Sequence, residues 1–190
     1  MKNHPDRKSN RLKNYDYSQD GYYFVTICTQ NREHFFGEIR NAEMQLNEYG
    51  KIAKKCWLEI PNHFPNILLD EFIIMPNHVH GILIIENNLI ENTNNVGNKN
   101  FCSLPWQTKF SKSLSSVIRG FKIGVTKYYR EKTVRNNNHC SLSKKIWQKS
   151  FYDHIIRNEE SLFQIREYIQ NNSLKWELEQ DRNHVSNIDF

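Results

Sequence analysis

The chain has 190 residues, a net charge of +5 and a mean hydropathy of −0.76. This length supports one hydrophobic core of ordinary size, so we expect a single domain over residues 1–190. No apolar run is long enough to cross a bilayer, and the N-terminus lacks the apolar stretch of a signal peptide, which predicts a cytoplasmic protein without a membrane partner. The four cysteines form no C-x-x-C pair, which argues against a zinc knuckle and against a disulfide scaffold.

Positive charge is concentrated in the middle of the chain. Residues 109–149 contain eleven Lys and Arg residues and one acidic residue, Glu131. The first 15 residues add five basic residues against Asp6. A solvated helix face is the ordinary explanation of such a run, but this excess is more than solubility needs and is typical of a surface that binds a polyanion.

In chain order, residues 1–20 are polar and basic, and they predict an arm that is ordered only when it is docked or bound to phosphates. Residues 22–29 are rich in aromatic and β-branched side chains and predict a central strand. Apolar residues at helical spacing predict a helix over residues 46–60, which Pro61 and Pro65 should end.

Two further strands are predicted over residues 68–75 and 78–85, joined by a turn at Pro76-Asn77. Residues 86–110 are rich in Asn and have no periodicity, so we expect a mobile loop. From Ser111 a long helix should follow, with an apolar stripe on one face and cations on the other. The stripe consists of Leu114, Val117, Ile118, Phe121, Val125 and Tyr128.

The last part of the chain predicts one or two short strands over residues 146–157 and then a helix that Asn158 caps. This helix should run through Tyr168 to Asn172, and because these two residues are four positions apart, they should be neighbours on one face. The last dozen residues are polar and are expected to fray.

His78 and His80 lie one residue apart in the strand predicted over residues 78–85. Side chains alternate along a strand, so both imidazoles should face the same side, together with Ile82 and Ile84, and both could reach one metal ion. Two hydrogen-bonded histidines without chemistry are the ordinary alternative, and the pair alone does not decide between these interpretations.

Three blocks of the sequence resemble those of the single-tyrosine HUH transposases, in the branch associated with repetitive extragenic palindromes (REP). The blocks are Met75-Pro76-Asn77-His78-Val79-His80-Gly81, Trp147-Gln148 with Phe151-Tyr152-Asp153-His154-Ile155-Ile156-Arg157, and Tyr168-Ile169-Gln170-Asn171-Asn172 with Leu174-Lys175-Trp176. They occur in the family's order, and the resemblance covers nearly the whole chain.

The resemblance implies an α+β fold with a ferredoxin-like or RRM-like antiparallel sheet, helices packed on it and the histidine pair on a central strand. It implies an enzyme that cleaves and rejoins single-stranded DNA beside hairpins through a 5′-phosphotyrosine intermediate. Such proteins usually act as homodimers, and this one would be cytoplasmic in a bacterium and nucleoid-associated when bound to DNA.

Carried over to this chain, the resemblance makes Tyr168 the catalytic nucleophile and makes His78, His80 and Asn172 the ligands of Mg²⁺ or Mn²⁺. The imidazoles alone would equally suit zinc. Relatives in the insertion-sequence branch often have Gln at the position of Asn172, and the REP-associated branch usually has Pro at the position of Ser173. The serine leaves the exit of the helix, and with it the placement of Asn172, open.

For DNA contacts we expect Arg119, Lys122, Lys127 and Arg130 of the long helix. The arm should supply a second, flexible contact through Arg7, Lys8 and Arg11.

Rival nucleophiles are Tyr128, Tyr129 and Tyr152, and His154 is a possible neighbour of the site. Two other functions remain open on the sequence: a hairpin-binding protein of the same fold without catalysis, and an HUH nickase that initiates replication.

Overall fold

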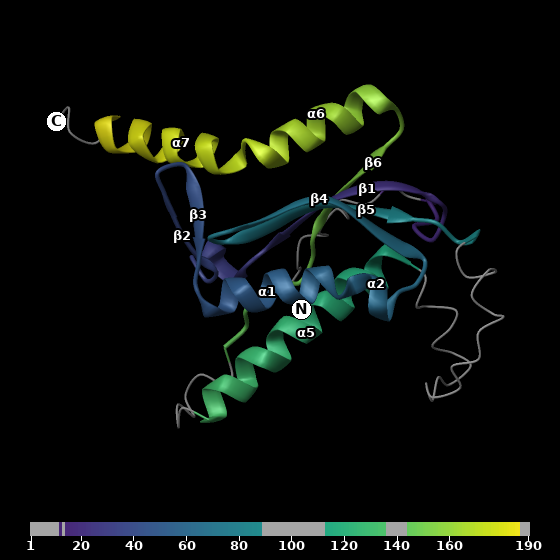
Figure 1. The fold of residues 1–190 in the computed structure, drawn as a ribbon, viewed down its shortest axis with the longest axis horizontal. Helices are drawn as coiled ribbons and strands as arrows, with labels where there is room; N and C mark the ends of the chain where they lie inside the picture. Colours follow the sequence, from purple (N-terminus) through teal and green to yellow (C-terminus); the bar gives the residue numbers. More distant parts are fainter. Residues whose placement is uncertain (1–11, 13, 89–112, 136–143, 187–190) are drawn as a thin grey trace, which may run out of the picture.

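The computed structural model describes residues 12, 14–88, 113–135 and 144–186 (Figure 1). The elements of these residues follow one another in the order β1 (Gly21–Cys28), the 3₁₀ turn η1 (Gln30–Arg32), β2 (Gly37–Arg40), β3 (Glu43–Leu46), α1 (Glu48–Leu58), α2 (Ile60–His63), β4 (Ile67–Met75), β5 (His78–Ile85), α5 (Leu114–Arg135), β6 (Tyr152–Ile156), α6 (Glu159–Gln170) and α7 (Asn172–Ser186).

Four strands form one antiparallel sheet in the order β4-β5-β1-β6. β1 and β5 lie at the centre of this sheet, and β4 and β6 lie at its two edges. This arrangement is the ferredoxin-like sheet that was predicted, with β5 as the central strand that carries the histidine pair. A separate hairpin of β2 and β3 extends beside it.

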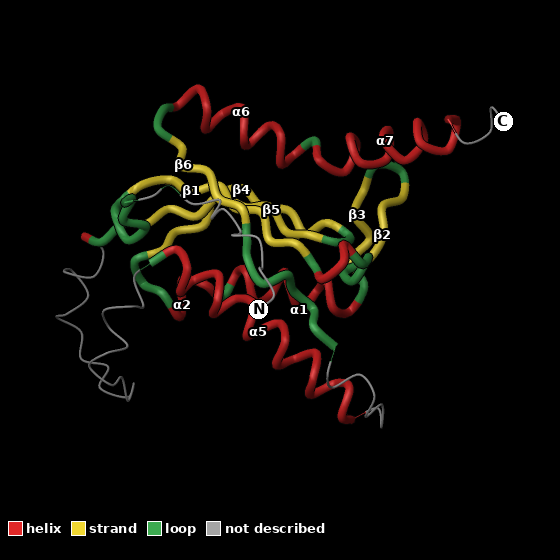
Figure 2. The backbone as a smooth tube through the Cα atoms, turned by 180° about the vertical axis from the view of Figure 1, so that it is seen from behind, coloured by secondary structure: helices red, strands yellow, loops and turns green. Residues whose placement is uncertain are grey.

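Helices cover both faces of the sheet. Figures 1 and 2 show α1, α2 and α5 on one face and α6 and α7 on the other. The face under α1 and α5 carries the larger core, which includes the fully buried Trp57, Val79 and Leu83. The face under α6 carries a smaller core around Ile82 and Ile169. Among the described residues, no helix has the length and apolar character needed to cross a membrane.

The long helix α5 buries a stripe that differs from the predicted one at its end. Tyr129, and not Tyr128, faces the core, and Tyr128 is exposed. The reason is the helical period of 3.6 residues, which carries the buried face from Val125 to a position four residues later. Pro61 also differs from its prediction, because it lies in the first turn of α2, where a proline is tolerated, and begins that helix rather than ending α1.

The two ends of the described chain are more ordered than the sequence predicted. Tyr17 is only 8% exposed and belongs to the larger core, where its ring contacts those of Tyr15 and Tyr23. The expected arm therefore excludes the residues around Tyr17. The expected frayed end is likewise wrong over most of its length, since α7 continues to Ser186. The predicted arm residues Arg7, Lys8 and Arg11, and the loop from residue 89 to residue 110, lie outside the described residues.

Candidate active site

His78 and His80 lie on β5 with their rings on the same face of the sheet, as the strand alternation predicts. They are 5% and 6% exposed, and their ring centroids are 4.4 Å apart. In the register of the sheet, His80 lies opposite Thr26 of β1 and opposite Ile73 of β4, so strands on both sides fix its position. The pair thus projects from a rigid central strand toward α6 and α7.

Each histidine is oriented through its Nδ1 atom. His78 Nδ1 lies 2.7 Å from Asn77 Oδ1, and because an amide oxygen only accepts, Nδ1 carries the proton and Nε2 keeps its lone pair. His80 Nδ1 lies 2.9 Å from Thr26 Oγ1, and because a hydroxyl can donate or accept, this contact fixes the orientation of the ring but not its tautomer. Such partners hold metal-binding histidines in one tautomer and one ring orientation. His78 Nε2 therefore keeps its lone pair for the site, and His80 Nε2 lies on the side of Tyr168.

Burial keeps both imidazoles neutral. It lowers the pKa of His78 to about 4, with a smaller contribution from the charge of Arg32. Burial first, and then the charges of His78 and Arg32, lower the pKa of His80 to about 3. A neutral imidazole is the form that binds a cation, so at neutral pH neither ring has to lose a proton first.

Tyr168 lies in the last turn of α6, and its hydroxyl oxygen is 3.3 Å from His80 Nε2. Its ring meets those of His80 and Phe24 edge-on. The side chain is 38% exposed, so the hydroxyl is held at the histidine pair while the residue stays open to solvent. Of the four tyrosines considered, this is the one that the structure brings to the histidines.

Two features hold α6 over the sheet so that Tyr168 reaches the pair. Asn158 caps the helix by accepting a hydrogen bond from the Ser161 backbone N–H at 2.8 Å, as predicted. Arg166 then forms a two-pronged ion pair with Asp70 of β4, in which Nε donates to Oδ1 at 2.9 Å. This pair lowers the pKa of Asp70 through the hydrogen bonds from Arg166.

Asn172 is the first residue of α7, is buried, and lines a pocket together with His78, His80 and Tyr168. The chain bends at Asn171, which ends α6, so Tyr168 and Asn172 belong to two helices and still face one site. Ser173 lies in the first turn of α7, where a proline would also be accepted. With serine at this position, Asn172 lines the pocket of the two histidines.

The pocket between the sheet and α7 has a volume of about 320 Å³. Its lining comprises Thr26, Arg32, His78, His80, Tyr168, Asn172, Lys175, Trp176 and Glu179. Sequence reasoning named four of these as site residues and missed Thr26, Arg32, Lys175, Trp176 and Glu179. Lys175, Trp176 and Glu179 could have been found from their helical spacing to Tyr168 and Asn172, whereas Thr26 and Arg32 could not.

The donors in this pocket fit a divalent cation. Two imidazoles and the amide side chain of Asn172 line the pocket together, the carboxylate of Glu179 also belongs to the lining, and in the described part of the chain no cluster of three or more His, Cys, Asp and Glu residues offers a richer site. Two imidazoles suit Mn²⁺ better than Mg²⁺, which prefers an all-oxygen shell. These metal donors alone do not define a reaction.

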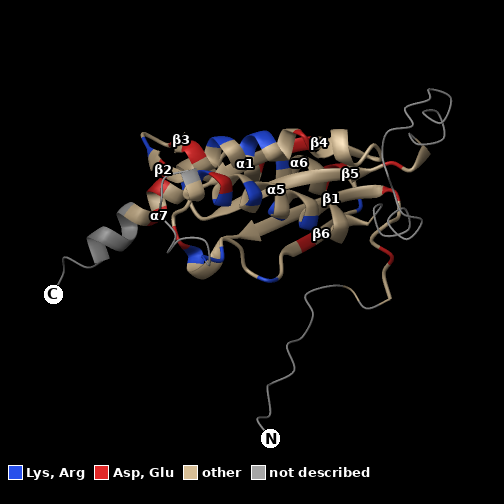
Figure 3. Ribbon diagram, turned by 90° about the horizontal axis from the view of Figure 1, so that it is seen from below, with Lys and Arg blue, Asp and Glu red and all other residues tan. Residues whose placement is uncertain are grey.

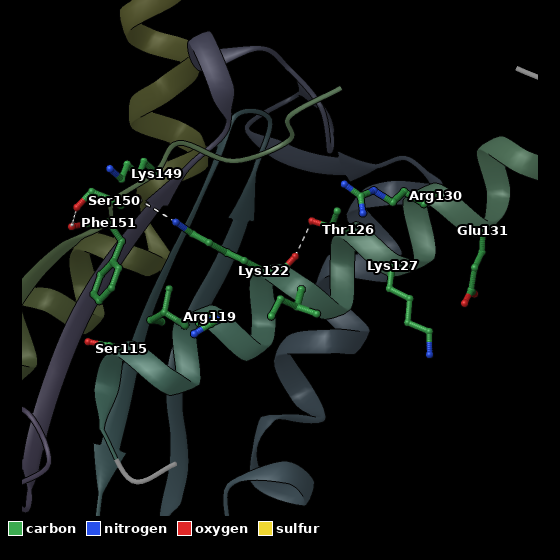
Figure 4. Close-up of a pocket in the computed structure, with 12 residues that line it drawn as sticks. Ser115, Arg119, Lys122, Thr126, Lys127, Arg130, Glu131, Lys149, Ser150 and Phe151 are labelled. Atoms are coloured by element: carbon green, nitrogen blue, oxygen red, sulfur yellow. Dashed lines mark hydrogen bonds between the residues drawn. The ribbon is translucent and has the colours of Figure 1, made fainter. Parts of the chain in front are cut away.

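A second hollow, the basic groove, lies on the other side of the sheet between α5 and residues 149–151 (Figure 4). It has a volume of about 770 Å³. Three of the predicted DNA-binding residues, Arg119, Lys127 and Arg130, line it with exposed side chains. Figure 3 shows Lys and Arg residues recurring along α5. A single carboxylate, Glu131, belongs to the described lining.

Lys122 of α5 also lines the basic groove, but its ammonium group is engaged within the protein. Its Nζ donates to the carbonyl oxygens of Gln148 at 3.0 Å and Ser150 at 2.9 Å, as Figure 4 shows for Ser150. Burial lowers the pKa of Lys122 to about 8. Of the four cations predicted on this helix, Lys122 thus ties α5 to the segment before β6, while the other three are exposed.

The remaining candidates do not line the pocket. His154 pairs with Phe24 across β1 and β6, on the face of the sheet that carries the histidine pair, but it does not line the pocket. Tyr152 pairs with Thr26 on the same face and is exposed. Tyr128 and Tyr129 lie on α5, on the opposite face of the sheet.

No family model matches the sequence. An uncharacterized protein of Haemophilus influenzae is 43% identical over 182 residues, which are 92% of this chain and 92% of that protein. A second protein of Haemophilus influenzae, named as a REP-associated tyrosine transposase, is 26% identical over 166 residues, or 86% of this chain and 77% of that protein.

Among solved structures, a REP-associated tyrosine transposase bound to a REP hairpin matches with a TM-score of 0.54 and 19% identity, over 87% of this chain and 73% of that chain. At this identity the likeness concerns the fold. The three sequence blocks, the strand order and the named sequence relative agree with it, and the chain is similar in sequence and fold to the REP-associated tyrosine transposases.

Proposed function

We propose that this protein cleaves and rejoins single-stranded DNA beside hairpins, with Tyr168 as the nucleophile. The observation that carries the proposal is the position of the Tyr168 hydroxyl, 3.3 Å from His80 Nε2, in one pocket with His78 and Asn172. Two neutral imidazoles on a rigid sheet, with a tyrosine and an amide from the helices above it, form the set of groups that a metal-assisted attack on a phosphodiester requires.

In the reaction, the Tyr168 hydroxyl oxygen forms a bond to phosphorus and the bond from phosphorus to the 3′ oxygen breaks. The phenol proton is transferred by way of solvent, and the 3′ oxygen leaves as a hydroxyl. A divalent cation held by His78, His80 and Asn172 would polarise the phosphate oxygens and offset the charge that develops on them. The ester bond to tyrosine retains the bond energy, so the reverse step can join another 3′ end without ATP.

Asn77 and Thr26 act through the histidines in this proposal. Each fixes the Nδ1 side of a ring and so aims its Nε2 into the pocket. The contact between the Tyr168 hydroxyl and His80 Nε2 implies that the tyrosine side chain changes its partner when a cation takes that nitrogen. The tyrosine is 38% exposed and free enough to do so.

The basic groove gives the DNA a second contact on the opposite face of the sheet. Its exposed cations, Arg119, Lys127 and Arg130, are suited to phosphates rather than to particular bases. The solved relative bound to a REP hairpin supports a hairpin as the ligand of this chain as well. The homodimer that the family resemblance implies belongs to the same proposal.

The test is to incubate the protein and Mn²⁺ with labelled single-stranded hairpin oligonucleotides taken from beside its own gene, and to run the products on a denaturing gel. The proposal expects label attached to the protein in the wild type and in Tyr152→Phe, and none in Tyr168→Phe. Binding without an adduct, across a range of hairpins, would instead support a hairpin-binding protein without catalysis.

A further inference from the structure

Arg32 lies at the end of the η1 turn, directly after β1, and its side chain lines the pocket of the two histidines. Asn31 and Arg32 both have left-handed backbones, with φ angles of 54° and 55°. Each such residue costs about 1–2 kcal/mol when it is not a glycine, so the surrounding structure must hold them in place. Strain of this kind is concentrated at functional sites.

The side chain of Asn77 holds the Arg32 backbone and a histidine together. Its Nδ2 donates to the carbonyl oxygen of Arg32 at 3.2 Å, while its Oδ1 accepts from His78 Nδ1 at 2.7 Å. Thr29 fixes the same turn, because its hydroxyl donates to the carbonyl oxygens of Glu33 and Asn77. The position of Arg32 is thus built into the network that orients the His78 ring.

The guanidinium group of Arg32 faces the histidines without a carboxylate partner. Its side chain lines the same pocket as His78 and His80. In the described ranges, no ion pair or side-chain hydrogen bond engages this group. A cation that is held beside two neutral imidazoles and is left unpaired is suited to an anion that arrives from outside.

Lys175 brings a second cation from another element. It lies on α7, three residues after Asn172, and its Nζ is 5.2 Å from the centre of the Tyr168 ring. No carboxylate among the described residues forms an ion pair with it. Glu179 lines the same pocket one turn later, so the rim carries two cations and one carboxylate. Both cations therefore line the pocket that the proposed nucleophile, Tyr168, also lines.

We infer that Arg32 and Lys175 together bind the phosphodiester that Tyr168 attacks, the arginine through its two-pronged donor face and the lysine as a point charge beside the tyrosine ring. This inference rests on the proposed function for the identity of the phosphate. It assigns to the site two substrate-binding residues that act on the non-bridging oxygens, independently of the groups that would hold a cation.

The first test measures binding in a Tyr168→Phe background, which cannot cleave. The affinity for a hairpin oligonucleotide with single-stranded flanks is measured against salt concentration, with and without Arg32→Gln and Lys175→Met. Loss of two phosphate contacts should weaken binding about tenfold and reduce the slope of log K against log salt by about 1.4, since each contact to a single strand contributes about 0.7. Lys51→Met with Lys54→Met, on α1, removes the same charge elsewhere and should change neither quantity beyond a general screening effect.

The second test measures the rate of adduct formation by proteins that retain Tyr168. Arg32→Gln with Lys175→Met should slow it at least 100-fold at saturating DNA, and Arg32→Lys should restore part of the rate. An unchanged salt slope together with an unchanged rate would overturn the two-cation site while leaving the proposed function intact. If the wild type forms no adduct but the slope still falls, the proposed function fails and the two cations stand as a phosphate-binding site.

Discussion

Gly81, the residue after His80 on β5, makes room for the indole of Trp57 on the opposite face of the sheet. A Cβ atom added at Gly81 would lie 2.3 Å from Trp57 Cζ2 and 2.8 Å from its Cη2. Both separations are far inside van der Waals contact. Trp57 is 0% exposed and packs against Phe72 and Phe121, so its ring has no free space to move into.

Gly81→Ala should therefore destabilise the fold. Overpacking of a well-filled core costs about 1–3 kcal/mol, and a clash with an aromatic ring belongs at the upper end. Replacing a glycine within a strand by alanine also stabilises the protein by about 0.5–1 kcal/mol, because it lowers the conformational entropy of the unfolded chain. The net loss of stability is therefore about 2 kcal/mol. For a chain of this size the melting temperature should fall by roughly 4–8 °C.

Thermal unfolding followed by circular dichroism measures this loss, with Gly124→Ala as the matched control. A Cβ atom at Gly124 of α5 would lie 3.4 Å from Cys56 Sγ, an ordinary contact, so this variant should be unchanged or more stable by up to about 1 kcal/mol. Adding Trp57→Phe to Gly81→Ala should cost less than the two separate losses together. If Gly81→Ala melts at or above the wild type, the packing argument is refuted.

Three further predictions concern the frame, the core and the site. Asp70→Asn should cost about 1 kcal/mol at pH 7, a figure reduced for the 41% exposure of the Arg166 side chain. The ion pair holds the pKa of Asp70 below 3.8, so the stability that it contributes is complete above that pH and is lost as the pH falls. In urea unfolding, the difference in stability between the wild type and Asp70→Asn should therefore be smaller at pH 3 than at pH 7. A difference that stays constant with pH would contradict the assignment. Tyr17→Ala should cost about 3 kcal/mol in the same assay, whereas a loss below about 1 kcal/mol would make its segment a detachable arm. Mn²⁺ at ten times its Kd should stabilise the wild type by about 1.4 kcal/mol, seen as a rise in melting temperature, and should not change the melting temperature of His80→Ala. An equal rise in both proteins would show that His80 is not a metal ligand.

The parts of the site that follow from local periodicity could be predicted from sequence. Alternation along a strand puts His78 and His80 on one face whatever the rest of the fold does. A spacing of four residues brings Tyr168 and Asn172 to one face of the helical segment. The bend at Asn171 involves a single residue, so the two side chains still face the same site. The order of the strands followed from the family resemblance rather than from any local pattern.

The parts that depend on register between distant segments could not be predicted. Thr26 reaches His80 because β1 and β5 pair with these two residues opposite each other, 54 residues apart in sequence. The sequence predicts only that Asn77 lies in a turn. Its hydrogen bond to the carbonyl oxygen of Arg32 requires the η1 turn to pack against it. Lys122 was predicted to contact DNA because charge alone does not reveal that backbone carbonyls of a later segment occupy its ammonium group.

The most direct test of the central claim is to locate the tyrosine that carries DNA. The wild-type protein is treated with Mn²⁺ and a hairpin oligonucleotide, digested with nuclease and trypsin, and examined by mass spectrometry for a peptide that carries a nucleotide. The account predicts the modification on the peptide of residues 167–175, whose sole tyrosine is Tyr168. Modification of the peptide of residues 150–157, which contains Tyr152, or of the one that contains Tyr128 and Tyr129, would contradict it.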